Sequence, residues 1–254
     1  MKNISKYFKT LSLVAIVLIV IGVIGGIVVG SDGSDESLTT LDETVDARDV
    51  LEVVIDARNQ RVHVHQISGN EARVVSSGVA TDLNLVVEVV DGVLSIESRR
   101  TTRNFQIGIN LGGFREIANP STLEVYLPVA MYERIQINSI NGRIEISDFN
   151  VGYLQIETTN ARIDISDIDG DVNARTTNGR ITFNNSTINQ DVNLQTTNGQ
   201  IKVNLLNQPE HAMFNLRATN GGTQIFGNNN STQQFGDGRY EVVLQTTNGR
   251  VSVN

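Results

Sequence analysis

Residues 176–181 read TTNGRI, and five close copies of this phrase recur between residues 139 and 251. The asparagines of the six copies are 19, 18, 20, 22 and 28 residues apart, and a polar loop at 227–238 accounts for the longest interval. Self-similarity at a near-constant spacing predicts a repeat architecture, in which each copy occupies the same place in a small structural unit. The other copies are SINGRI (139–144), TTNARI (158–163), TTNGQI (196–201), ATNGGT (218–223) and TTNGRV (246–251).

Apolar and polar residues alternate on both sides of each asparagine. Ile144 and Ile146 follow the first copy, and Leu154 and Ile156 precede the second. A period of two residues, rich in β-branched side chains, is typical of β-strands, and no window beyond residue 45 has a helical period. Each repeat is therefore predicted to be a strand, a turn, a second strand and an Asn-Gly corner.

Two all-β folds fit this pattern, an antiparallel meander of hairpins and a single-stranded β-solenoid. Asn-Gly is a common hairpin turn, but a meander of about twelve one-sided strands would leave its apolar face uncovered. Stacked coils bury those faces, and at about 4.8 Å apart their asparagines can hydrogen-bond as a ladder. Ala161 at one glycine position also favours the solenoid, because a type I′ turn requires a positive φ there. We therefore predict a β-solenoid with a structural ladder of Asn141, Asn160, Asn178, Asn198, Asn220 and Asn248.

The N-terminal stretch 11–30 (LSLVAIVLIVIGVIGGIVVG) contains no charged residue. A helix of this length spans about the 30 Å hydrocarbon core of a bilayer, so it predicts one transmembrane helix. Three lysines precede it and many acids follow, which predicts cytoplasmic residues 1–10 and an extracellular body at the cell membrane. A cleaved signal peptide is the alternative, although its apolar stretch is normally only about 7–15 residues. Gly22, Gly26 and Gly30 have the spacing that allows close helix packing, so a homo-oligomer is an option.

The rest of the chain divides into three segments. Residues 31–45 are acidic and lack hydrophobic periodicity, which predicts a flexible linker. Residues 46–130 contain alternating stretches without the repeat phrase, which predicts irregular first coils or a β cap, and residues 131–254 are predicted to be the solenoid repeats. Asn254 falls inside the last strand pair, so we expect a bare sheet edge there.

Composition excludes several classes of function. The chain contains no cysteine, which removes disulfides, thiolate nucleophiles, iron–sulfur clusters and Cys-rich zinc sites. Its formal net charge is −8, and because residues 1–30 contain three lysines and no acid, the remainder carries −11. A body this acidic is not expected to bind nucleic acid.

Two further phrases, LEVYLP (123–128) and RIQI (134–137), precede the first copy. Together with the TTNGRI-type repeats they resemble a family of bacterial "putative adhesins" that carry a domain of unknown function, including LiaG-like envelope proteins and relatives of the auto-transporter head (GIN) domains. The resemblance extends over residues 48–254. It implies a right-handed β-helix on the cell surface, often behind a single membrane anchor, and it implies no catalytic residue.

The second residue after the asparagine is arginine in four of the six copies. In a stack these arginines form a stripe, with a lysine close by, that can meet phosphate or carboxylate groups of a wall polymer. The alternative is a solvated face with local ion pairs, because Glu145 and Asp164 each lie two residues beyond an arginine. The candidate binding residues are Arg143, Arg162, Arg180, Lys202 and Arg250.

Other side chains are weaker candidates for chemistry. His63 and His65 alternate on one strand and point the same way, but the third ligand of a metal site would have to come from elsewhere. Acids between residues 164 and 171 crowd one turn, although Gly170 comes too early for a calcium loop. No catalytic motif interrupts the repeat, so we predict no enzyme activity, metal site or cofactor.

The sequence thus predicts a non-catalytic, membrane-anchored surface protein that binds or scaffolds cell-envelope components, with cell-wall or surface polymers as its partners. The alternative is an accessory protein of envelope-stress signalling that contacts a membrane protein. A polysaccharide-acting enzyme is the least favoured hypothesis.

Overall fold

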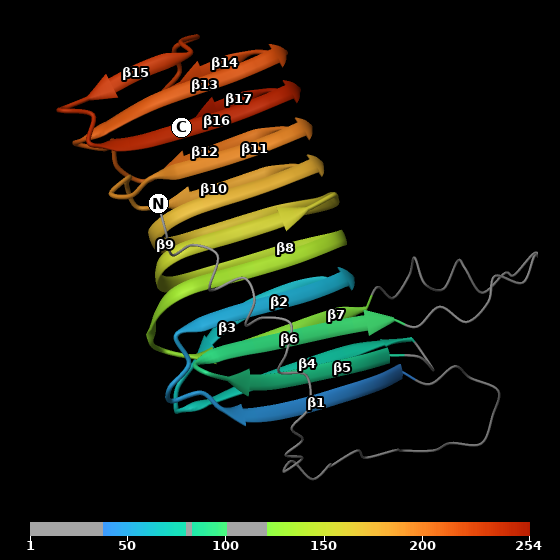
Figure 1. The fold of residues 1–254 in the computed structure, drawn as a ribbon. Coiled ribbons are helices and arrows are strands. Elements are labelled where there is room, and N and C mark those ends of the chain that lie inside the picture. The colour runs from blue at the N-terminus through green and yellow to red at the C-terminus, as the bar shows by residue number, and fades with distance from the viewer. Residues whose placement is uncertain (1–37, 80–82, 101–120) are drawn as a thin grey trace, which may run out of the picture.

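The computed structural model describes residues 38–79, 83–100 and 121–254, and in these ranges it contains strands and turns without a helix (Figure 1). No helix in the described ranges is long and apolar enough to cross a membrane, and the predicted span at 11–30 lies outside them. The strands are β1 (Leu38–Asp46), β2 (Glu52–Asn59), β3 (Arg61–Ile67), β4 (Glu71–Val79), β5 (Leu83–Val90), β6 (Val93–Arg100), β7 (Thr122–Pro128), β8 (Met131–Thr158), β9 (Asn160–Asn178), β10 (Ile181–Asn185), β11 (Val192–Asn198), β12 (Ile201–Leu205), β13 (Ala212–Asn220), β14 (Thr223–Ile225), β15 (Thr232–Phe235), β16 (Tyr240–Asn248) and β17 (Val251–Val253).

Parallel pairing between successive coils makes the chain a β-solenoid. Ile163 of β9 pairs in register with Ile144 of β8 on one side and with Ile181 of β10 on the other. Equivalent positions of the repeat therefore lie directly above one another, and each becomes a column along the stack. In a meander of hairpins, neighbouring strands would be antiparallel. Here neighbouring strands are parallel and one whole coil apart in the sequence, which rules out the meander and confirms the predicted all-β solenoid.

The stack has two faces that meet at the asparagines. The first face holds the strand segments that precede the asparagine of each coil, and the second face holds those that follow it. Ile144, Ile163 and Phe183 on the second face, and Leu154 and Val172 on the first, point inward and are at most 2% exposed. Burial of these alternating rows between the two faces forms one continuous core, which supplies the main stabilisation of the fold.

The order of coils in space differs from their order in the sequence. Strand β16 lies between β11 and β13, and β17 lies between β12 and β14, so the last coil is inserted between the two coils that precede it. The expectation of a bare edge at Asn254 is therefore wrong, because this coil is paired on both sides. The end of the stack is formed instead by β13, β14 and the antiparallel strand β15. Phe214, Phe226 and Phe235 pack edge to face there, with ring centroids 5.6–6.2 Å apart.

The other end of the stack is an antiparallel cap. The coil β2–β3 lies between β6–β7 and β8, while β5 pairs antiparallel with β6, and β4 with β7. Beyond them, β1 pairs antiparallel with β4 over nine residues. The predicted flexible linker at 31–45 is thus wrong for residues 38–45, where backbone pairing to β4 and the hydrogen bond from Arg73 Nε to Asp42 Oδ1 (2.9 Å) order an acidic strand. That arginine also holds the pKa of Asp42 below its usual value.

Each residue of the Thr-Thr-Asn-Gly phrase has a separate role at the corner between the faces. The first threonine points inward, and its hydroxyl donates to a carbonyl of the adjacent coil, as in Thr196 Oγ1 to Gly179 O (3.0 Å). The second threonine, such as Thr197, is exposed. Close approach requires the glycine in the later coils, where a Cβ on Gly199 would lie 1.7 Å from Gly179 O, whereas one earlier coil accommodates Ala161 at this position. The phrase therefore sets the distance between adjacent coils.

The asparagines form a hydrogen-bonded ladder at the same corner, in which each side-chain Nδ2 donates to the Oδ1 of its neighbour at 2.6–2.9 Å. The structure brings all six predicted asparagines together and adds a seventh at the cap. Because of the inserted coil, Asn248 precedes Asn220 in space. The order along this line, which we call the Asn edge, is Asn59, Asn141, Asn160, Asn178, Asn198, Asn248 and Asn220.

We predict that Gly199→Ala lowers the free energy of unfolding by about 1–3 kcal/mol, because the added methyl group overlaps the Gly179 carbonyl. Gly222→Ala is the matched control, since a Cβ there meets nothing within 4 Å, and it should change stability by less than about 0.5 kcal/mol. Urea unfolding followed by circular dichroism measures both. Equal effects of the two variants would contradict the packing role.

Candidate binding surface

A column of basic residues runs beside the Asn edge on the second face. Register places Arg143 next to Arg162, and the same column continues through the position of Arg180 and Gln200 to Arg250. Lys202 lies two residues further along its strand, in the adjacent outward-facing column. The structure thus brings the five predicted binding residues onto one face.

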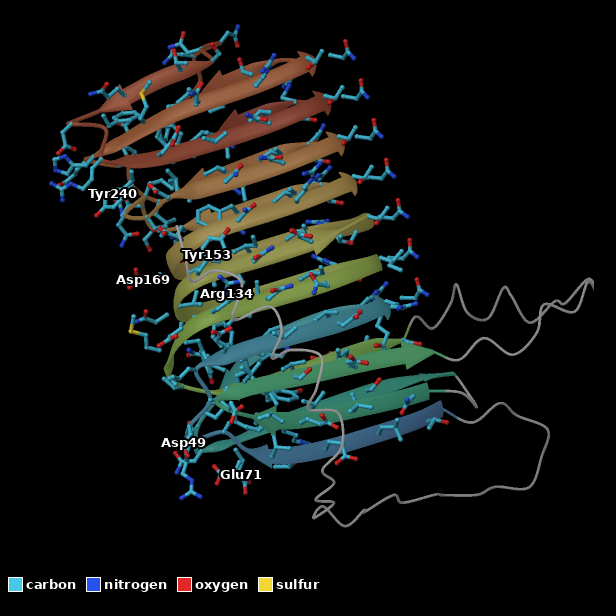
Figure 2. All side chains as sticks on the ribbon, viewed as in Figure 1. Asp49, Glu71, Arg134, Tyr153, Asp169 and Tyr240 are labelled. Atoms are coloured by element: carbon cyan, nitrogen blue, oxygen red, sulfur yellow. The ribbon has the colours of Figure 1, made fainter. Side chains whose placement is uncertain are left out.

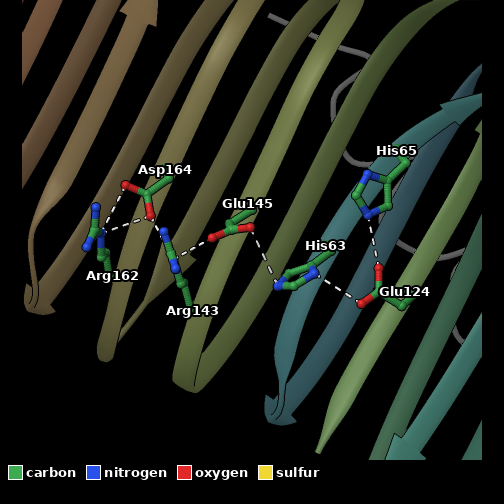
Figure 3. Close-up of polar contacts among 7 residues, drawn as sticks. All are labelled: His63, His65, Glu124, Arg143, Glu145, Arg162 and Asp164. Atoms are coloured by element: carbon green, nitrogen blue, oxygen red, sulfur yellow. Dashed lines mark hydrogen bonds and ion pairs between the residues drawn. The ribbon is translucent and has the colours of Figure 1, made fainter.

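Two of these arginines are already neutralised by acids of the same face (Figure 3). Arg143 Nε lies 2.9 Å from Asp164 Oδ2 and 2.5 Å from Glu145 Oε1. Arg162 Nε lies 2.9 Å from the same Asp164 oxygen. The hydrogen bond to Asp164 raises the pKa of Arg143. These contacts leave little positive charge for a ligand at this half of the column.

The remaining three cations differ from these two arginines in their surroundings. In the described part of the chain, no ion pair or hydrogen bond joins the side chains of Arg180, Lys202 or Arg250 to an acid, and all three are exposed. The in-register neighbours of Lys202 are Thr182 and Ser252, which are uncharged. This half of the stripe is therefore free to meet an anion.

A second group of cations lies across the Asn edge, on the first face. Arg175, Gln195, Gln245 and Arg217 occupy successive positions of one column, in that order. They line a shallow depression of about 300 Å³ together with threonines of the corner. Neither arginine forms an ion pair within the described residues, and both are exposed. Polar, uncharged side chains thus separate two free guanidinium groups.

Charge is segregated along the stack. Residues 172–254 contain six cations and four acids, a net charge of +2, whereas the described residues before them (38–79, 83–100 and 121–171) contain nine cations and nineteen acids, a net charge of −10. Three of the four acids of 172–254 precede strands of the first face, and the fourth, Glu241, is the second residue of β16, so all four lie at or near the edge opposite the asparagines, where Figure 2 shows Asp169 and Tyr240. That edge is about 20 Å from the Asn edge along a strand. The positive surface is therefore local, within an acidic protein.

Several residues of this surface escaped the sequence analysis. Arg175 and Arg217 precede the repeat phrase rather than follow it, so no periodic signal marks them. Asn59 and Arg61 stand in the phrase Asn-Gln-Arg-Val, which keeps the spacing of Asn-Gly-Arg-Ile with glutamine in place of glycine. A search that tolerated that exchange would have found a seventh copy at residues 57–62.

The two alternating histidines lie on β3 and face a third side chain, Glu124 of β7. His63 Nδ1 is 3.0 Å from Glu124 Oε1, and His65 Nε2 is 3.0 Å from Glu124 Oε2. Within the described residues, His63, His65 and Glu124 form a group in which one possible metal-ligand atom of each side chain lies within 4.8 Å of the other two. The acids at 164–171 form no such group: Asp164 binds arginines, and Asp171 accepts from the Asp191 amide.

Comparison with known proteins finds one family and several similar solved structures. The sequence pattern of the family described as Toastrack DUF4097 matches residues 85–254. A structure described as a putative cell adhesion protein from Clostridium sporogenes has a TM-score of 0.51 at 11% identity, over 85% of this chain and 99% of the other. One described as a putative adhesin from Bacteroides fragilis has a TM-score of 0.42 at 10% identity, over 87% and 100%. A search of curated proteins finds no match.

We predict that a double-mutant cycle of Arg143→Gln and Asp164→Asn yields a coupling of about 0.5–1 kcal/mol at low salt, because the pair is only partly exposed. Coupling should fall in 1 M salt, where the Debye length is about 3 Å. A cycle that combines Asp164→Asn with Arg250→Gln serves as the control and should be additive. Urea unfolding measures all variants, and a coupling that does not respond to salt would contradict the electrostatic assignment.

Proposed function

Because the chain belongs to the Toastrack DUF4097 family, we propose that it is a non-catalytic, adhesin-like binding protein whose ligand is an anionic polymer of the cell envelope. The observation that carries this proposal is the set of five unpaired cations along the Asn edge of residues 172–254. They are Arg175, Arg180, Lys202, Arg217 and Arg250.

The spacing of these cations suits an extended ligand. Coils are about 4.8 Å apart, so Arg180 and Arg250, two coils from each other, are separated by about 10 Å along the stack. Arginine can bind phosphate or carboxylate through two parallel hydrogen bonds, while the lysine adds a point charge. A linear polymer that lies along the Asn edge can therefore meet cations from both faces. Exposed threonines and the asparagine amides between them supply neutral hydrogen-bonding groups.

A binding role agrees better with this surface than catalysis does. Its polar residues recur in register from coil to coil, as a repetitive ligand requires, whereas a catalytic group is expected to interrupt the repeat at one place. The Clostridium sporogenes protein of the same fold is described as a "putative cell adhesion protein", which also supports binding. Fold alone does not establish a function, so the cation pattern remains the principal argument.

Attachment to the membrane is part of the proposal and rests on the sequence. The apolar stretch 11–30, preceded by Lys2, Lys6 and Lys9, is proposed to anchor the body on the outer side of the cell membrane. The phrases LEVYLP (123–128) and RIQI (134–137) and the TTNGRI-type repeats support the LiaG-like and GIN-related subclass. The alternative is an accessory role in envelope-stress signalling, with a neighbouring membrane protein as the partner. Self-association through Gly22, Gly26 and Gly30 is proposed from their four-residue spacing, which allows two helices to pack closely in a membrane.

The proposal predicts salt-sensitive retention of the detergent-purified full chain on an immobilised polyphosphodiester or polycarboxylate, with neutral dextran as the background. Replacement of Arg180, Lys202 and Arg250 by glutamine should weaken retention by about 10–100-fold, since each exposed ion pair contributes up to about 1 kcal/mol.

The matched control replaces Arg143 and Arg162, which are bound to Asp164, and should retain most of the affinity. Equal losses in the two variants would contradict the assignment to residues 172–254. Retention that does not depend on salt would contradict the anionic ligand.

A further inference from the structure

From the geometry around β3 and β7 we propose that His63, His65 and Glu124 bind a divalent metal ion of the zinc type. This site is separate from the unpaired cations of the proposed binding surface. The two histidines stand at i and i+2 of β3, so both side chains leave the same side of the sheet. Parallel pairing places Glu124 of β7 directly beside His63.

The three donor atoms already have nearly the separation that a metal requires. Each oxygen of Glu124 lies 3.0 Å from a ring nitrogen, His63 Nδ1 on one side and His65 Nε2 on the other. Ligands of a tetrahedral ion with bonds of about 2.1 Å stand about 3.4 Å apart. All three atoms lie within 4.8 Å of one another, so small side-chain rotations bring them to that distance.

Neighbouring side chains hold both rings in the orientation that binding needs. With Nδ1 of His63 directed at the metal, its Nε2 faces Glu145 Oε2 at 3.6 Å, the position of an outer carboxylate that orients a ligating histidine (Figure 3). Tyr126 stacks on His65, with ring centroids 5.4 Å apart and planes at 26°. The two rings therefore have support that an incidental surface pair would lack.

The donor set indicates the class of metal and leaves one position open. Two imidazoles and one carboxylate suit Zn²⁺, which binds three protein ligands and a water in open sites. The side chains of His63, His65 and Glu124 are 24%, 44% and 25% exposed, so solvent can reach the fourth position. A bound ion would tie β3 to β7, at the junction between the cap and the repeats.

The test is titration of the full chain, purified in mild detergent and treated with a chelator, with ZnCl₂ by calorimetry and with Co²⁺ by visible spectroscopy. We expect one equivalent of Zn²⁺, ligand-field bands for Co²⁺, and a higher melting temperature with the metal. His63→Gln, His65→Gln and Glu124→Gln should each weaken binding by roughly 100-fold or more, and Glu145→Gln by about 10–100-fold.

His211→Gln provides the matched control, because that histidine pairs with Asp237 in another part of the fold. It should leave Zn²⁺ affinity unchanged. Melting of each metal-free variant shows that it is folded. Absence of Zn²⁺ binding by the folded wild-type chain would overturn the proposal, and so would affinity that survives Glu124→Gln or that is lost in His211→Gln.

Discussion

Close approach of backbones at the Asn edge is the constraint on which the rest of the structure depends. The glycine of one coil lies against the glycine carbonyl of the next with no room for a side chain, as the 1.8 Å between a Cβ on Gly249 and Gly199 O shows. Threonine hydroxyls and asparagine amides then bond across the same gap. These contacts allow one register only, since any slip would separate every donor from its acceptor.

Because the register is fixed, the position of a residue within its repeat determines where it lies on the surface of the stack. Residues at the same place in successive repeats become a column, so an exchange in one copy changes one point of an extended surface. The column of Arg143 and Arg162 is neutralised because the acids two residues later have their own column beside it. In the next coils that second column contains Thr182, Lys202 and Ser252 instead, so Arg180 and Arg250 have no acidic partner among the residues that the structure describes. The charge of each part of the stack thus depends on which residues occupy these two positions in each repeat, while the backbone of the coils stays the same.

The repeat phrase was sufficient to predict the fold, because its period, its alternation and the exchange of Gly for Ala161 all agree with stacked coils. It could not predict the position of β16, since the repeats are so alike that Asn248 fits beside Asn198 or Asn220 equally well. The same ambiguity hid Glu124: its contact with His63 depends on the coil β2–β3 lying between β7 and β8, which no local pattern encodes. The strand β1 was missed because backbone pairing at a cap needs no hydrophobic period.

The inserted coil also determines how the protein can be built. A ribosome makes β13 and β14 before β16 and β17, yet in the finished stack the later pair separates the earlier one from β11 and β12. Coils added one at a time, in order of synthesis, would bring β13 against β11 and close the place that β16 must occupy. The native arrangement therefore requires that β13 and β14 remain undocked, or detach again, until β16 and β17 arrive. Coils follow the order of synthesis only from β8 to β12, and the final docking of β13 and β14 comes after that of β16 and β17.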